Sequence, residues 1–88
     1  MDGKRLLEEF YLFMMVELAY KIIFEAFAGK FDKADEPYIF HLERVAAPFR
    51  DDQFLFVAAL LHDLVEDCPE WNFDKLTEVG FHRRIVLA

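Results

Sequence analysis

Apolar residues recur at helical spacing along this chain, and few turn-forming residues interrupt them. The 88 residues include three Gly and three Pro, and no stretch has the two-residue alternation of a half-buried strand. From Lys4 to Ala28, two apolar stripes run along one predicted helix. They are Leu7, Phe10, Met14, Leu18 and Ile22, and Leu12, Met15, Ala19, Ile23 and Ala26. A helix that is apolar on two sides packs between two surfaces, either in a bundle or against another chain.

Four shorter helices are predicted in the rest of the chain. We expect them over residues 37–47, 52–67, 72–79 and from 81 onward. Asp51 or Asp52 caps the second of these helices and Asn72 the third, while Gly29 and Gly80 act as stops. The inward-facing residues predicted for the helix after Pro37 are Ile39, Leu42, Val45, Ala46 and Phe49. The predicted fold is therefore all-α, a single domain over residues 1–88 with about five helices.

The apolar content of the chain is high for its length. A chain this short buries about 60–65 % of its unfolded surface, yet 56 % of its residues are apolar and eleven are Phe. Average proteins contain about 45–50 % apolar residues. The excess predicts either a partner surface or a larger domain of which this chain is one portion. We expect a homo-oligomer that associates through the first helix.

Charge and cysteine content exclude several classes of partner. The net charge of −7 argues against nucleic acid, whose phosphates require a basic surface, and against an anionic membrane. The apolar stretch Phe10–Val16 is too short to span a bilayer. The single Cys68 excludes an internal disulfide and fits a reducing cytoplasm, where we expect a non-catalytic thiol.

An acidic cluster with a histidine ends the predicted helix of residues 52–67. Its apolar stripe is Val57, Leu60, Leu61 and Leu64. Helical spacing places His62 beside Glu66 and Asp63 beside Asp67. Carboxylates at a helix C-terminus are unfavourable, because the helix dipole is negative there. A divalent cation held by histidine and aspartate would compensate them, although a solvated acidic helix end fits the spacing equally well.

A second histidine completes a candidate metal site. His41 lies in the helix after Pro37, where it can face His62 and Asp63. Two imidazoles and one carboxylate suit Mn²⁺, Fe²⁺, Zn²⁺ or Co²⁺ rather than Ca²⁺. Glu66 and Asp67 are near enough to act on an attacking water. The basic residues Lys30, Lys33 and Arg44 lie around the same loop and helix and could bind phosphate, although solvated charges are their default interpretation.

These motifs resemble a known family. His41, followed by His62-Asp63 within the segment Ala58–Asp67, resembles the HD-domain metal phosphohydrolases. The segment Phe31–His41 resembles, more narrowly, the RelA/SpoT-type guanosine tetraphosphate hydrolases and their small stand-alone relatives. The stretch Leu76–Phe81 fits the same pattern. The resemblance extends over residues 17–88.

The resemblance implies an HD-domain-like helical bundle that is usually Mn²⁺-dependent. Such enzymes remove pyrophosphate from the 3′ position of guanosine tetra- or pentaphosphate. Carried over by position, His41, His62 and Asp63 would be metal ligands, and Glu66 and Asp67 would activate or orient the attacking water.

The chain also departs from this pattern. The family usually has His at the position of Phe27, Gly at that of Asp35 and Pro at that of Leu42. Lys33 is not one of these departures, and the resemblance places it near the substrate base or phosphates. The family's last metal ligand is an Asp further downstream. We therefore expect a truncated or degenerate member, or a site completed by another chain.

The favoured function is a cytoplasmic, metal-dependent phosphohydrolase acting on a phosphorylated nucleotide, above all guanosine tetra- or pentaphosphate. The competing hypothesis is a non-catalytic helical oligomerisation or binding module that retains the motif. A third is a phosphatase for another small phosphate ester, because the motif constrains the chemistry more than the substrate.

Overall fold

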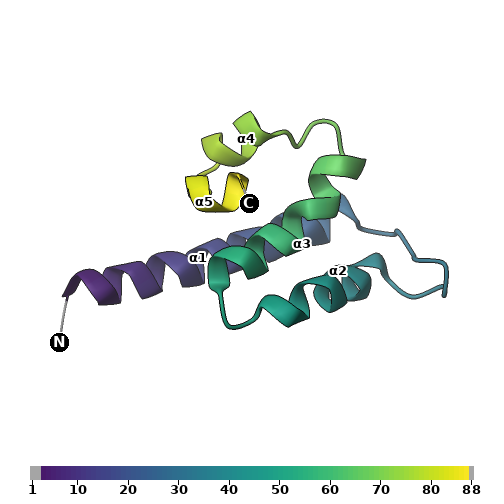
Figure 1. Cartoon of the computed structure of the whole chain (residues 1–88). Helices are drawn as coiled ribbons and strands as arrows, with labels where there is room; N and C mark the ends of the chain where they lie inside the picture. Colours follow the sequence, from purple (N-terminus) through teal and green to yellow (C-terminus); the bar gives the residue numbers. More distant parts are fainter. Residues whose placement is uncertain (1–2, 88) are drawn as a thin grey trace.

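The structure, a computed structural model, describes residues 3–87 and is all-α, as predicted (Figure 1). Its elements are α1 (Gly3–Ala26), α2 (Tyr38–Ala46), the short 3-10 helix η1 (Ala47–Phe49), α3 (Gln53–Asp67), α4 (Phe73–Glu78) and α5 (Arg83–Val86). Between residues 3 and 87 there is no strand, only an isolated bridge between Phe31 and Pro37. The ends of the predicted domain, residues 1–2 and 88, lie outside the described residues.

Helix α3 lies at the centre of the fold. It packs against α1, α2 and α5, with α2 on one side and α4 and α5 on the other (Figure 1). The predicted apolar stripe of this helix is confirmed as core, because Val57, Leu60, Leu61 and Leu64 are all buried. The same helix therefore carries the deepest part of the core and, at its C-terminal end, His62 and Asp63.

The predicted caps define where the helices begin. Asp52, not Asp51, caps α3, since its Oδ1 accepts from the backbone N–H of Phe54 at 3.0 Å and of Leu55 at 3.3 Å. The Asn72 side chain caps α4 by accepting from the Lys75 N–H at 2.8 Å. Side-chain caps satisfy N–H groups that have no partner within the helix.

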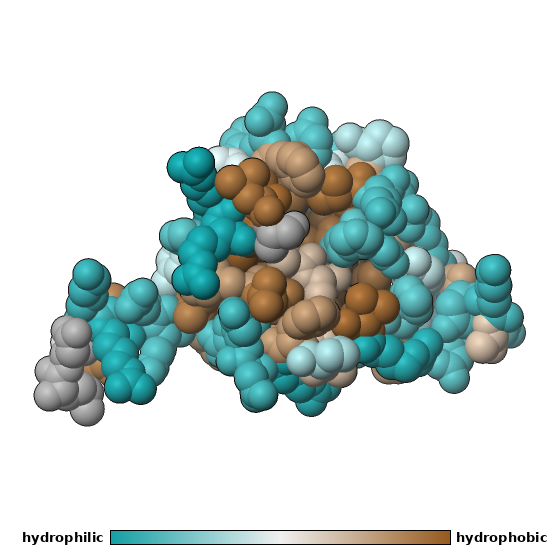
Figure 2. Space-filling view, viewed as in Figure 1, coloured by the Kyte–Doolittle hydropathy of each residue, from teal (hydrophilic) through white to brown (hydrophobic). Residues whose placement is uncertain are grey.

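Two inward-facing residues were predicted wrongly. Val45 and Phe49 are 43 % and 41 % exposed, whereas Leu42 and Ala46 are buried as expected. Helix α2 turns this second pair toward α3, and Val45 and Phe49 instead form one wall of a shallow apolar cavity of about 300 Å³ beside Leu55. The face shown in Figure 2 is correspondingly apolar near its centre and hydrophilic around it.

Helix α1 buries residues of both predicted apolar stripes, but only in its second half. Met15, Ala19, Ile22 and Ile23 are buried, whereas Leu7 is 72 % exposed and Phe10 64 % exposed. The N-terminal half of α1 extends beyond the rest of the molecule (Figure 1). The packing predicted for the first stripe is therefore confirmed at Leu18 and Ile22, whereas Leu7, Phe10 and Met14 are not covered by any part of residues 3–87. None of the helices in this range is long and apolar enough to cross a bilayer.

A tight loop connects α1 to α2. Asp32 organises it, because its Oδ1 accepts from the N–H of Ala34 at 2.9 Å and of Glu36 at 3.0 Å. The carboxyl pKa of Asp32 is lowered mainly by the Glu36 N–H, then by the Ala34 N–H and the Arg44 guanidinium. Asp35 adopts the left-handed conformation with φ of 64°, a conformation that glycine adopts without strain.

The effect of substitutions at Asp35 on the free energy of unfolding is expected to depend on the backbone conformation of this residue rather than on its charge. Asp35→Val should lower the free energy of unfolding by about 1–2 kcal/mol relative to Asp35→Gly, because a β-branched side chain is strained at positive φ. Urea unfolding of the two variants measures the difference. Ala34→Val, one residue earlier and outside the left-handed region, is the matched control and should have little effect. Equal stability of the Asp35 variants would contradict this account.

Candidate metal centre

Helices α2 and α3 place both predicted histidine ligands beside the third predicted ligand, Asp63. The Asp63 carboxylate lies between the two imidazoles. His41 Nε2 is 3.5 Å from Asp63 Oδ2, and His62 Nδ1 is 3.3 Å from Asp63 Oδ1. The Asp63 side chain is one-fifth exposed, while that of His62 is two-thirds exposed. The site is thus a surface cluster, open to solvent on the side of His62.

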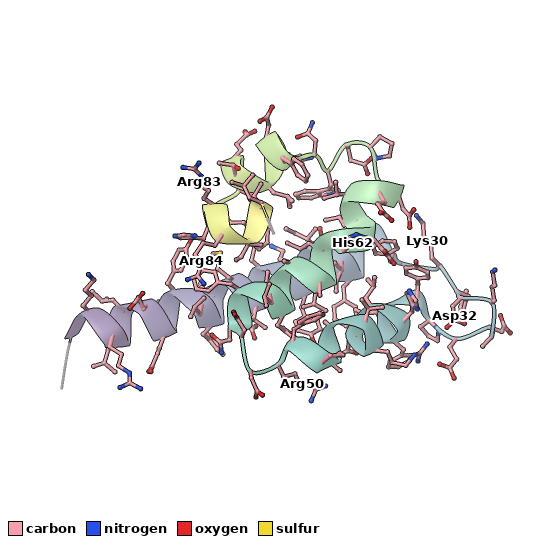
Figure 3. The ribbon with its side chains drawn as sticks, in the orientation of Figure 1. Lys30, Asp32, Arg50, His62, Arg83 and Arg84 are labelled. Carbon is pink, nitrogen blue, oxygen red and sulfur yellow. The ribbon has the colours of Figure 1, made fainter. Side chains whose placement is uncertain are left out.

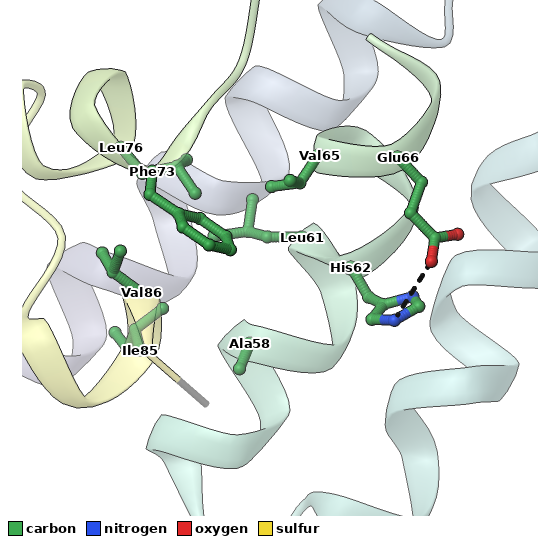
Figure 4. Close-up of a pocket in the computed structure, with 9 residues that line it drawn as sticks. All are labelled: Ala58, Leu61, His62, Val65, Glu66, Phe73, Leu76, Ile85 and Val86. Carbon is green, nitrogen blue, oxygen red and sulfur yellow. Dashed lines mark ion pairs between the residues drawn. The ribbon is translucent and has the colours of Figure 1, made fainter. Parts of the chain in front are cut away.

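Glu66 extends the cluster by one helical turn. Its Oε1 is 3.6 Å from His62 Nε2 (Figure 4). One potential ligand atom from each of His62, Asp63 and Glu66 lies within 4.8 Å of the others. Side chains at i and i+4 share a helix face, and this spacing places Glu66 beside His62 as predicted.

Tyr38 belongs to the same cluster, although the sequence analysis did not select it. Its hydroxyl donates to Asp63 Oδ2 at 2.8 Å, and its ring centroid lies 5.1 Å from that of His41. The hydrogen bond to Asp63 is the largest factor that raises the pKa of Tyr38 to about 12, followed by burial. Tyr38 precedes His41 by three residues on one helix, and this spacing was a signal that could have identified it.

The Tyr38–Asp63 hydrogen bond gives stability a defined pH dependence. The folded pKa of about 12 exceeds the ordinary 10.0, so the folded chain retains the phenol proton where the unfolded chain loses it. The stabilisation is complete below pH 10 and is lost as the pH rises toward 12. In metal-stripped protein, wild type should therefore exceed Tyr38→Phe in stability at pH 9, and the difference should shrink by pH 11. Urea unfolding at both values measures it, and a constant difference would contradict the assignment.

Phe27 closes the apolar side of the cluster. It is 5 % exposed, and its ring stacks on that of Tyr38 with centroids 4.9 Å apart. Lys30 Nζ lies 5.1 Å from the Phe27 ring centroid, and Lys30, Asp32 and His62 lie toward one end of the molecule, opposite Arg83 and Arg84 (Figure 3). The position at which the family usually has His therefore lies beside the cluster, but in this chain it contributes no ligand atom.

The predicted phosphate-binding residues have different surroundings. Lys33 lines a cavity of about 480 Å³ together with Tyr38 and His41. Arg44 is engaged elsewhere, since its guanidinium pairs with Asp32 Oδ2 at 3.2 Å and Glu36 Oε2 at 3.3 Å. Lys33 is therefore better placed than Arg44 to meet an anion at His41.

Asp67, the second predicted catalytic carboxylate, is exposed at the last residue of α3. Like the predicted ligand His41, it lies outside the group of three side chains with converging ligand atoms, which are His62, Asp63 and Glu66. Its negative charge adds to the factors that raise the pKa of Tyr38. The structure therefore places Asp67 near the cluster electrostatically, whereas Glu66 contacts it directly.

A second cavity opens on the other side of His62. It measures about 270 Å³ and is lined by His62, Glu66 and apolar side chains of α3, α4 and α5 (Figure 4). The polar cluster therefore stands between two cavities. One contains Lys33 and His41, and the other is apolar apart from His62 and Glu66.

Comparison with known proteins finds two similar sequences that carry the same name. Two chloroplastic sequences of Arabidopsis thaliana, both named as the GTP diphosphokinase RSH1, are 36 % identical to this chain over 66 residues. The match covers 72 % of this chain and 8 % of each relative, so the chain spans less than a tenth of their length. No protein-family model and no solved structure matches the chain. The similarity suggests the RelA/SpoT-type family.

Proposed function

We propose that this chain is a metal-dependent phosphohydrolase of the HD type that acts on a phosphorylated nucleotide. The observation that carries the proposal is the convergence of His41, from α2, and His62, from α3, on the carboxylate of Asp63. Two imidazoles and a carboxylate drawn from two helices are a donor set that binds divalent transition metals.

The distance of each histidine from Asp63 is that of two ligands of one ion. Ligand atoms about 2.0–2.2 Å from a divalent ion lie about 3.0–3.6 Å from one another. His41 Nε2 is 3.5 Å from Asp63 Oδ2 and His62 Nδ1 is 3.3 Å from Asp63 Oδ1, so each histidine is within this range of one Asp63 oxygen. The three residues whose ligand atoms converge within 4.8 Å are His62, Asp63 and Glu66, and His41 would have to move toward them to share the ion. His41, His62 and Asp63 would hold the ion, and Mn²⁺ is the favoured metal, with Fe²⁺, Zn²⁺ and Co²⁺ as alternatives. When bound, the ion would supply Lewis-acid polarisation of a phosphoryl oxygen and would make an adjacent water more acidic.

The remaining residues of the cluster would position the reactants. Tyr38 would hold the Asp63 carboxylate in place through its hydroxyl. Glu66, beside His62 and largely exposed, would accept the proton of the attacking water, with Asp67 as a second acceptor at the helix end. Water oxygen would then add to phosphorus as the bond to the leaving oxygen breaks.

Guanosine tetra- or pentaphosphate is the proposed substrate, with loss of the 3′ pyrophosphate. Two observations support it: the relatives are named as a GTP diphosphokinase, and the segment Phe31–His41 resembles guanosine tetraphosphate hydrolases. Lys33 would bind phosphate in the cavity beside His41. Lys30 contributes positive charge next to Phe27, while Arg44 would first have to leave its carboxylate partners.

Pyrophosphate release tests the proposal. Metal-stripped protein is incubated with guanosine tetraphosphate, with and without Mn²⁺, and with GDP as the control substrate that lacks a 3′ pyrophosphate. We expect pyrophosphate from the tetraphosphate only, and only in the presence of metal. Absence of release at every metal tested would reject the hydrolase.

A non-catalytic module is the second candidate, and two observations favour it. Phe27 is apolar where the resemblance implies a histidine, and the N-terminal half of α1 is exposed and apolar. This function predicts no metal-dependent hydrolysis together with stable self-association. The pyrophosphate assay therefore separates the two candidates.

A further inference from the structure

Helix α1 presents an apolar surface that no other segment of residues 3–87 covers. We define the arm face as Leu6, Leu7, Phe10, Phe13 and Met14, whose exposed fractions range from 47 % to 72 %. At 3.6 residues per turn, these side chains lie on the side of α1 roughly opposite to Met15, Ala19 and Ile22, which pack into the core. Tyr11, between them, donates its hydroxyl to the Gly80 carbonyl at 3.0 Å and ties α1 to the α4–α5 turn. A second helix can therefore lie along the arm face without meeting the body of the molecule.

We propose that the arm face is the interface of an antiparallel homodimer whose two-fold axis passes at Phe10. The spacing of its residues carries the proposal, because it is symmetric about Phe10. Leu7 and Phe13 are three residues away on either side, and Leu6 and Met14 are four. A two-fold interface pairs residue i of one copy with residue j of the other, and j with i. With the axis at Phe10, every residue of the arm face meets an apolar residue of the second copy.

Charge favours the antiparallel arrangement over the parallel one. On the continuation of the arm face, α1 carries Glu17 and then Lys21. A parallel pair would set each of these against its own copy, and facing like charges are destabilising. The antiparallel pair avoids both contacts. Residues 3–16 have no net charge, since they contain Lys4, Arg5, Glu8 and Glu9. The charge of −7 of each chain therefore lies almost entirely in residues 17–88, and the antiparallel pair would place these parts of the two copies at opposite ends.

The accessible surface area of the molecule is larger than that of a compact monomer, as expected if a partner covers part of it. Its accessible surface is 6215 Å², whereas a compact monomer of this mass has about 5,400 Å². The excess of about 800 Å² equals one partner's share of a standard protein–protein interface. The proposal is independent of the hydrolase, because no arm-face residue belongs to the metal centre.

Mass in solution tests the interface. Sedimentation equilibrium of wild type should give twice the chain mass of 10.5 kDa. Phe10→Glu should weaken association by about a hundredfold or more, because it places two charges at the centre of the interface. Phe40→Glu, which changes an exposed Phe of α2, is the matched control and should remain dimeric. A wild-type monomer, or a dimer that tolerates Phe10→Glu, would overturn the proposal.

Disulfide formation tests the direction of pairing. The variants Leu6→Cys and Met14→Cys, mixed and oxidised, should form a mixed disulfide. Leu6→Cys alone should not, because antiparallel pairing separates the two copies of residue 6 by about 12 Å along the axis, whereas a disulfide requires Cα atoms within about 7 Å. Cys68 is buried, and wild type serves as the control for its reactivity. Efficient cross-linking of Leu6→Cys alone would overturn the antiparallel axis.

Discussion

Mn²⁺ at about a hundredfold excess over its dissociation constant is expected to raise the free energy of unfolding by about 2.7 kcal/mol. His41 and His62 lie on different helices and converge on Asp63 only in the folded chain, so the ion would bind the native state preferentially. For a domain of this size, the stabilisation corresponds to a rise in Tm of roughly 10–20 °C. Thermal unfolding of metal-stripped protein, followed by circular dichroism during a titration, measures it.

Variants of the cluster identify the ligands. His62→Ala and Asp63→Asn should each abolish the rise in Tm and also the release of pyrophosphate, and a chelator should reverse the rise in wild type. Asp51→Asn removes an exposed carboxylate outside the cluster and is the matched control, in which the full rise should persist. A rise retained in His62→Ala, or none in wild type, would contradict the proposed metal centre.

Leu60→Ala is expected to lower the free energy of unfolding by about 3–4 kcal/mol, a large share of the stability of a small domain. Leu60 is fully buried at the centre of α3, which packs against α1, α2 and α5. A cavity there would remove contacts with several helices at once. Urea unfolding measures the loss.

The matched control for this truncation lies on the same helix. Leu55 is 43 % exposed, and Leu55→Ala removes the same atoms with an expected loss below about 1 kcal/mol. Similar losses for the two variants would mean that α3 is not the centre of the core.

Helical spacing was sufficient to predict the core stripe of α3 and the cap of α4, while the cap of α3 was narrowed to Asp51 or Asp52. Val57, Leu60, Leu61 and Leu64 share one helix face in any helix of that register, and Asp52 and Asn72 are effective caps wherever a helix begins after them. The same spacing predicted that His62 lies beside Glu66. These features depend on contacts within a helix, which sequence alone determines.

Contacts between helices were predicted less well. Val45 and Phe49 have the spacing of core residues, but spacing does not reveal that no segment of residues 3–87 covers them. The bond from Tyr38 to Asp63 and the pairing of Arg44 with Asp32 and Glu36 depend on how α2 and its preceding loop lie against α3. Distances along the chain contain no such information, and Arg44 was therefore assigned a phosphate role without regard to its nearer carboxylates.

The central position of α3 determines how its backbone amides should exchange with solvent deuterium. Because α3 contacts α1, α2 and α5, its buried amides should exchange only through global unfolding, whereas amides of the exposed half of α1 should exchange through local fraying. A ligand held by His62 and Asp63 would therefore slow exchange in α3, and a second copy on the arm face would slow it first in residues 6–14. The map of protected amides thus distinguishes an occupied metal centre from an assembled dimer in a single measurement.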